Sequence, residues 1–233
     1  MSVSRALLPG LALASLAALA GALPARAEEQ AAPAPGCAEA VALRAQRFYE
    51  GVEDLSADFE QTARVATLGD APGGEEGRTR GKVLFAKPGR MRWEYREPAP
   101  SLVVTDGKTL WTYDESLREA QRLSNAEGVL SGAAIQFLLG EGKILESFEV
   151  SAEDCSAERV RLVLVPREPA TYERLAIEVE RDGMVRASEV ADLFGNVTRV
   201  VFADVHTNTR PPAERFRFEP PQGVRVIEVP SGP

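Results

Sequence analysis

The residues of this 233-residue chain that could do chemistry are few and widely spaced. There is one histidine, His206, and acids such as Asp192 and Asp204 could in principle transfer protons. A catalytic or metal site needs several polar groups that converge, and the sequence has no His and Cys cluster with metal-ligand spacing. It also has no G-x-S-x-G motif and no glycine-rich phosphate loop after a predicted strand. We therefore expect His206 to be a surface residue and the protein to be a binding protein, not an enzyme.

The chemistry that the sequence favours is apolar binding. In the stretch RMRWEYR, residues 90–96, the side chains of Met91, Trp93 and Tyr95 alternate with charged ones. Strict alternation predicts a strand with one face in water and the other face covered. On spacing alone, these three side chains could equally fill a core or line a binding cavity.

Two further predicted strands direct apolar side chains towards the same interior. Leu55 and Phe59 alternate with polar residues in LSADFEQTARV, and Val83 and Phe85 do so in GKVLFAK. Lys87 shares the strand face of Val83 and Phe85, where a charge is costly unless it is hydrogen-bonded. We therefore expect Lys87 to donate hydrogen bonds to carbonyls or side chains of the helical stretch at 127–139, which would cover the cavity as a lid. The alternative is that its ammonium reaches the rim and bonds water.

The elements that position these residues are one helix followed by a series of strands. Apolar residues at three- and four-residue steps predict an amphipathic helix over residues 37–54. Asp-Gly pairs at 106–107 and 182–183 and a Gly-Asn pair at 195–196 then predict tight hairpins. Short connections of this kind join antiparallel neighbours, and we expect about ten antiparallel strands.

One stretch within the strand series has helical spacing. Residues 124–142 are predicted to form one or two short helices. Many of the strands carry charge on one face, so two or three helices should cover the other face of a large, curved sheet. The predicted fold class is mostly β with helices (α+β).

Residues 1–27 have the features of a secretory signal peptide. Arg5 precedes an apolar run that ends in the small-x-small pattern A-R-A, so cleavage is expected before Glu28. An uncleaved membrane anchor is the alternative, since the run approaches spanning length. Residues 28–36 are rich in Ala and Pro and are expected to be a flexible arm. Residues 37–233 are expected to form a single domain.

Export would place the mature chain in an oxidising compartment, where Cys37 and Cys155 would more often pair than remain free. Cys37 ends the string APGC, which faintly resembles a lipid-attachment site, but a polar stretch separates it from the apolar run. Removal of residues 1–27 deletes two arginines and no acid, so the net charge of −8 becomes −10. An acidic chain disfavours nucleic acid and anionic lipid as partners.

Four segments form a specific set in their order and spacing. They are GKVLFAKPGRMRWEYREP, LVVTDGKTLWTYD, the R-D-G turn at 181–183, and FRFEPPQGVRVI near the C-terminus. Together they resemble the periplasmic outer-membrane lipoprotein carrier (LolA) family over nearly all of the mature chain. The resemblance implies an unclosed antiparallel β-barrel with a helical lid over an apolar cavity. It implies no cofactor.

The resemblance also implies roles for single residues. Met91 and Trp93 fall on cavity-lining positions of the family, and Leu55 and Phe59 match apolar positions on its first strand. Lys87 matches an arginine that bonds to the lid in well-known members. The lysine is a departure, because it carries one compact charge where arginine has a planar fork of donors. The expected cavity residues are Leu55, Phe59, Val83, Phe85, Met91, Trp93 and Tyr95, and the expected lid residues are Val129, Leu130, Ile135 and Leu138.

The implied cargo is a triacylated lipoprotein that an ABC transporter releases from the inner membrane and that passes to an acceptor lipoprotein at the outer membrane. Burial of acyl chains is worth about 0.8 kcal/mol per methylene, so a carrier needs a cavity that can open. We expect a monomer in the periplasm. The alternative function is a lipoprotein- or lipid-sensing regulatory domain of the same fold, and a third is a structural envelope protein with a filled core.

Overall fold

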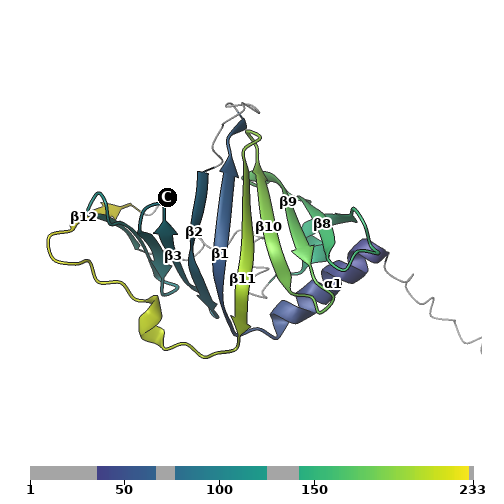
Figure 1. Cartoon of the computed structure of the whole chain (residues 1–233), viewed down its shortest axis with the longest axis horizontal. Coiled ribbons are helices and arrows are strands. Elements are labelled where there is room, and N and C mark those ends of the chain that lie inside the picture. The colour runs from purple at the N-terminus through teal and green to yellow at the C-terminus, as the bar shows by residue number, and fades with distance from the viewer. Residues whose placement is uncertain (1–35, 67–76, 125–141, 231–233) are drawn as a thin grey trace, which may run out of the picture. The chain divides into compact units, whose positions relative to one another are not determined.

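The computed structural model describes residues 36–66, 77–124 and 142–230, which all belong to one compact unit, residues 35–233. These residues form one twelve-stranded sheet with the strand order β12-β6-β5-β4-β3-β2-β1-β11-β10-β9-β8-β7 (Figure 1). The two edge strands, β12 and β7, do not pair with each other, so the sheet of the described residues is not closed. The elements are α1 (Cys37–Glu50), β1 (Asp54–Arg64), β2 (Gly77–Ala86), β3 (Arg90–Glu97), β4 (Ser101–Thr105), β5 (Thr109–Asp114), β6 (Glu119–Ser124), α3 (Ile144–Ser147), β7 (Phe148–Ala152), β8 (Val160–Pro166), β9 (Tyr172–Val179), β10 (Val185–Asp192), β11 (Val197–Thr207), the short 3-10 helix η2 (Ala213–Phe216) and β12 (Arg225–Val229).

Helix α1 confirms the predicted N-terminal helix but ends earlier than expected. Gly51 caps the helix, and its N–H bonds the carbonyls of the last turn. The chain then enters β1 at Asp54, where the side-chain period changes from helical to alternating. Helix α1 lies against the end of the sheet formed by β7 and β8 (Figure 1). Its buried residues are Val41, Ala42, Ala45 and Tyr49.

Antiparallel pairing is confirmed along most of the sheet, and β12 is the exception. It pairs parallel with β6 at the far edge of the sheet. The reason is the connection: the chain leaves β11 in the middle of the sheet and crosses to that edge through the long segment 208–224 (Figure 1). Tight turns oblige neighbours to be antiparallel, whereas a long crossover does not.

The two faces of the sheet bury different amounts of apolar surface. The face covered by α1, here called the helix face, carries the main core together with α1 and α3. On the opposite face, here called the outer face, Leu84, Ala86 and Phe216 form a small second cluster. Segment 208–224 therefore covers part of the outer face, while the helix face contains the apolar interior.

The stability of the protein should fall at high pH because of Tyr49. Its hydroxyl lies in the core and accepts a hydrogen bond from the backbone N–H of Val185 at 3.2 Å. Burial raises the pKa of Tyr49 to about 12. In the unfolded chain it ionises near pH 10, so above this pH the unfolded state loses the proton first.

The contribution of Tyr49 is thus complete below pH 10 and declines by about 1.4 kcal/mol by pH 11. Urea unfolding at pH 9, 10 and 11 measures this decline. In the Tyr49→Phe variant the decline should be shallower by that amount. An equally steep decline in the variant would contradict the assignment.

Candidate functional site

The helix face carries a cluster of aromatic side chains from three adjacent strands. Phe59 is on β1, Phe85 is on β2, and Trp93 and Tyr95 are on β3. The ring of Trp93 lies 4.8 Å from that of Phe59 and 5.9 Å from that of Phe85, measured between centroids. The rings of Tyr95 and Phe59 lie 5.3 Å apart. These spacings and tilted orientations are those of attractive aromatic pairs.

The strand register explains why these side chains meet. Leu55, Phe85 and Met91 are direct neighbours across β1, β2 and β3. Trp93 follows two residues after Met91, so the pleat returns it to the same face. The structure thus brings together all of the predicted cavity residues on one face. Leu55, Phe59, Val83 and Phe85 are buried there, and Met91, Trp93 and Tyr95 are partly buried against them.

Gly81 is part of this arrangement, although the sequence analysis did not single it out. It lies opposite both Phe59 and Tyr95 in the register. A Cβ at Gly81 would clash with the backbone carbonyl of Glu94 and would also come 2.9 Å from the Phe59 ring, closer than real Cβ contacts. The absence of a side chain allows the two rings to meet across β2. A glycine inside a strand pattern is the signal that could have indicated this close approach.

A small apolar hollow continues the aromatic cluster towards α1. It has room for about one water molecule. Sequence analysis predicted two of the side chains that line it, Leu55 and Phe85. The others come from α1, β10 and β11, and the alternation of apolar residues in β10 and β11 was the available signal. The lining residues are Tyr49, Leu55, Phe85, Val185, Phe202 and Val205.

Lys87 bonds to the C-terminal end of α1. Its Nζ donates to the backbone carbonyl oxygens of Tyr49, at 3.1 Å, and Glu50, at 3.3 Å. A cation at this end of a helix also interacts favourably with the helix dipole. The predicted lid residues Val129, Leu130, Ile135 and Leu138 lie outside the described residues, so a bond from Lys87 to the lid stays a prediction.

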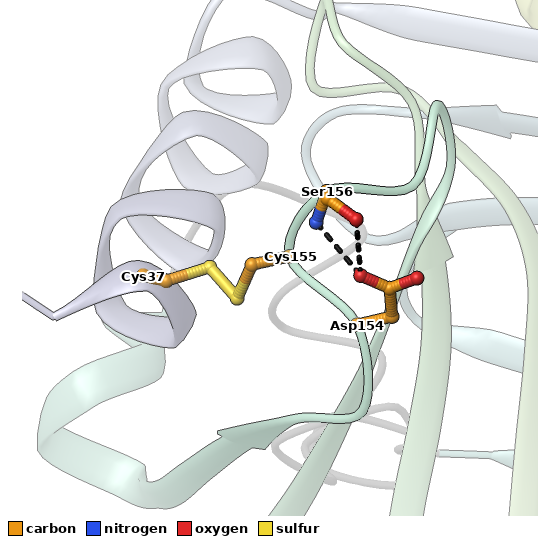
Figure 2. Close-up of a disulfide and its surroundings, with 4 residues drawn as sticks. All are labelled: Cys37, Asp154, Cys155 and Ser156. Carbon is orange, nitrogen blue, oxygen red and sulfur yellow. Dashed lines mark hydrogen bonds between the residues drawn. A yellow bond between two sulfur atoms is a disulfide. The ribbon is translucent and has the colours of Figure 1, made fainter.

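A disulfide holds the other end of α1. Cys37, the first residue of the helix, is bonded to Cys155 in the turn between β7 and β8, and their Cα atoms are 6.3 Å apart (Figure 2). In that turn, the carboxylate of Asp154 accepts hydrogen bonds from both the backbone N–H and the hydroxyl of Ser156. The predicted pairing of the two cysteines is confirmed. Helix α1 is therefore tied at its start by a covalent bond and at its end by Lys87.

Of the polar residues considered for catalysis, His206 and Asp204 lie together and Asp192 lies apart from them. The side chain of His206 is 60% exposed and lies 3.1 Å from a carboxylate oxygen of Asp204. Asp192 is in the turn that joins β10 to β11, towards the other end of β11 from Asp204. Among the described residues, no group of three or more His, Cys, Asp or Glu side chains could hold a metal ion. No helix in the described ranges is both long enough and apolar enough to span a membrane.

Comparisons with known proteins agree on one family. The family model described as "Outer membrane lipoprotein carrier protein LolA" matches residues 50–219. The outer-membrane lipoprotein carrier protein of Chromobacterium violaceum is 34% identical over 196 residues, which are 83% of this chain and 90% of that protein. The protein of the same name from Alkalilimnicola ehrlichii is 33% identical over 203 residues, with coverages of 85% and 89%.

Among solved structures, an uncharacterized conserved protein from Thermus thermophilus is similar in fold. The TM-score is 0.51 at 11% identity, and the match covers 83% of this chain and all of that one. At this level of identity the likeness concerns the fold alone.

Proposed function

Because the chain belongs to the outer-membrane lipoprotein carrier (LolA) family, we propose that it carries lipoproteins across the periplasm with their acyl chains on the helix face of the sheet. It takes them up as an ABC transporter releases them from the inner membrane, and it delivers them to an acceptor lipoprotein at the outer membrane. Residues 37–233 are the carrier domain, and the carrier acts as a monomer after removal of residues 1–27.

The observation that supports this proposal is the apolar wall formed by Phe59, Phe85, Met91 and Trp93. Each of these side chains can contact methylene groups without leaving a charge unpaired. Met91 is also flexible, which suits cargo of variable shape. Transfer of acyl chains from water to such a wall is driven by about 0.8 kcal/mol for each methylene.

The hollow that the described residues form is too small to hold an acyl chain without a change. The hollow beside the aromatic cluster has room for about one water molecule. The chains must therefore displace side chains or segments that now cover the wall. Helix α1 is tied at Cys37 and near Lys87, which restrains it from moving away from the wall. The energy needed for this displacement lowers the affinity for cargo. A lower affinity suits a carrier, because a carrier must also release its cargo.

Co-purification tests the function directly. We expect a mass spectrum of the protein isolated from periplasm to contain triacylated lipoprotein. We also expect removal of the acyl chains to abolish binding of the purified cargo. Equal binding of acylated and deacylated cargo would contradict the proposal.

Trp93 should report on the binding of cargo. The chain has two tryptophans, and Trp111 lies on the outer face against Phe218, with ring centroids 5.5 Å apart. In the Trp111→Phe variant, binding of a triacylated lipoprotein should shift the emission of Trp93, because acyl chains would replace the ring of Phe59 as its neighbour.

The matched control is Trp93→Phe, in which the emission of Trp111 should stay unchanged on binding. If co-purification shows that cargo is bound and the emission of Trp93 does not change, Trp93 does not lie in the cargo site.

A further inference from the structure

Polar atoms with unused hydrogen-bonding capacity lie beside the aromatic cluster. Trp93 Nε1 and Thr79 Oγ1 are both shielded from solvent, and neither has a hydrogen-bond partner in the described part of the chain. The hydroxyl of Tyr95 donates to Gln61 Oε1 at 3.4 Å, which is long for an O–H donor. Buried polar groups are almost always paired, so two orphaned atoms on the same face of adjacent strands require an explanation.

These four residues form one contiguous group, here called the polar set. Thr79 on β2 lies directly opposite Gln61 on β1. Gly81, two residues after Thr79 on the same face, lies opposite Tyr95 on β3. The rings of Tyr95 and Trp93 are 6.4 Å apart. The polar set therefore shares Trp93 and Tyr95 with the aromatic cluster and extends it towards Thr79 and Gln61 at one end of the apolar wall.

The opposite end of the wall is apolar. Leu55, Phe85 and Met91 occupy the corresponding positions on β1, β2 and β3, two residues beyond the level of Trp93. The helix face thus changes along the strands from apolar side chains to hydrogen-bonding ones. An amphipathic surface of this kind matches a ligand that has an apolar body and a polar end.

Packing alone does not require the orphaned atoms. Val at position 79 has the shape of Thr, and Phe at position 93 would fill much of the space of Trp; neither would leave a buried polar atom unpaired. The indole N–H could face a neighbouring ring, but such contacts are weak. The polar set is therefore better explained by a partner that is absent when the carrier is empty.

The chemistry of the polar set defines that partner. An indole N–H can only donate, and the Thr79 hydroxyl is free to donate, so the partner must be an acceptor. Burial raises the pKa of Tyr95, which keeps its phenol protonated and able to donate. A carboxylate or phosphate would need a cation. Lys87, which follows β2, lies past Phe85 at the opposite end of the wall and is bonded to the end of α1. The acceptor that fits is an uncharged carbonyl oxygen.

We propose that the polar set is a subsite for the ester carbonyls that link acyl chains to the lipoprotein. Trp93 Nε1 donates to one carbonyl oxygen and Thr79 Oγ1 donates to a second. These bonds place the starts of the two ester-linked acyl chains beside Tyr95 and direct their methylenes towards Phe85 and Met91. The proposal rests on the carrier function and adds the part of the cargo that the site recognises.

The test compares two synthetic lipopeptides that bind the whole mature chain. One is a tripalmitoylated lipopeptide with two ester carbonyls, and the other is its ether analogue, in which methylenes replace those carbonyls. One hydrogen bond changes an equilibrium roughly two- to tenfold, so the wild-type protein should bind the ester about tenfold more tightly. The Trp93→Phe/Thr79→Val double variant should bind both lipopeptides with equal affinity.

The outcomes separate the subsite from the carrier function. The Trp111→Phe control, changed on the outer face, should keep the full preference for the ester. Equal affinities of the wild type for both lipopeptides would overturn the subsite and leave the carrier function intact. If the wild type bound neither lipopeptide, both the subsite and the carrier function would be overturned.

A double variant that keeps the preference would overturn the assignment to these residues. If the double variant fails to fold by circular dichroism, the nearly isosteric Thr79→Val variant decides alone. It should lose part of the preference, and a full preference in this variant would remove Thr79 from the subsite.

Discussion

Replacement of both Cys37 and Cys155 by serine should lower the free energy of unfolding by about 3–5 kcal/mol. The two cysteines are 118 residues apart in the sequence and are bonded in the structure. A crosslink over so long a loop removes many conformations from the unfolded chain, and in the chain-entropy model this is the main source of its stabilisation. Urea unfolding of the mature chain without reductant measures the effect.

The wild-type protein provides its own control in this experiment. In the presence of reductant its unfolding midpoint should fall to that of the double serine variant, which should not respond to reductant. The structure adds a local consequence, because Cys155 holds the first turn of α1 against the turn between β7 and β8. In the double serine variant, amide exchange in the first turn of α1 should therefore be faster than in the wild type. Two thiols that react with an alkylating reagent in protein from the periplasm would rule out the bond.

Replacement of Lys87 by leucine should destabilise the protein by about 3 kcal/mol and slow the delivery of cargo. The ammonium donates to the carbonyls of Tyr49 and Glu50, and a hydrogen bond to a charged group contributes about 1.5–3 kcal/mol. In the variant, these two carbonyls at the end of α1 lose the hydrogen bonds from the ammonium of Lys87. Urea unfolding measures the loss of stability.

The matched control for stability is Lys82→Leu on the same strand. Lys82 lies on the outer face, where it pairs with Asp58 at 3.0 Å, and both side chains are about half exposed. Exposed ion pairs contribute little, so this variant should lose less than about 1 kcal/mol. A loss as large as that of Lys87→Leu would show that the charge itself, and not the bonds to α1, explains the effect.

The slower delivery follows from the position of Lys87 beside the hollow. Tyr49 lines the hollow, and Lys87 holds the backbone of that residue. Without this anchor the empty form is less favourable, so less free energy is released when cargo leaves and the site closes again. A transfer assay measures the rate of delivery from the carrier to the acceptor. If the Leu variant delivers lipoprotein at the wild-type rate, Lys87 does not help to expel the cargo.

Some features of the site could be predicted from the sequence because they depend on neighbouring residues. The pleat of a strand sends alternate side chains to opposite faces, so the order of residues 90–96 already places Met91, Trp93 and Tyr95 together. The Asp-Gly pair at 106–107 likewise predicted the hairpin between β4 and β5, where Gly107 has a φ of 95°. With only two cysteines in the chain, the disulfide had one possible pairing.

Other features depend on which distant segments become neighbours, and only the tertiary structure decided them. Alternation predicts the face of a side chain but not the residue opposite it, because the register comes from long-range pairing. The close approach at Gly81, the parallel pairing of β12 and the bonds from Lys87 to α1 are of this kind. The same holds for the polar set, since Thr79 and Trp93 become orphaned only when three strands and the surrounding core bury them together. Burial and hydrogen-bond satisfaction are properties of the packed interior, and no local pattern determines them.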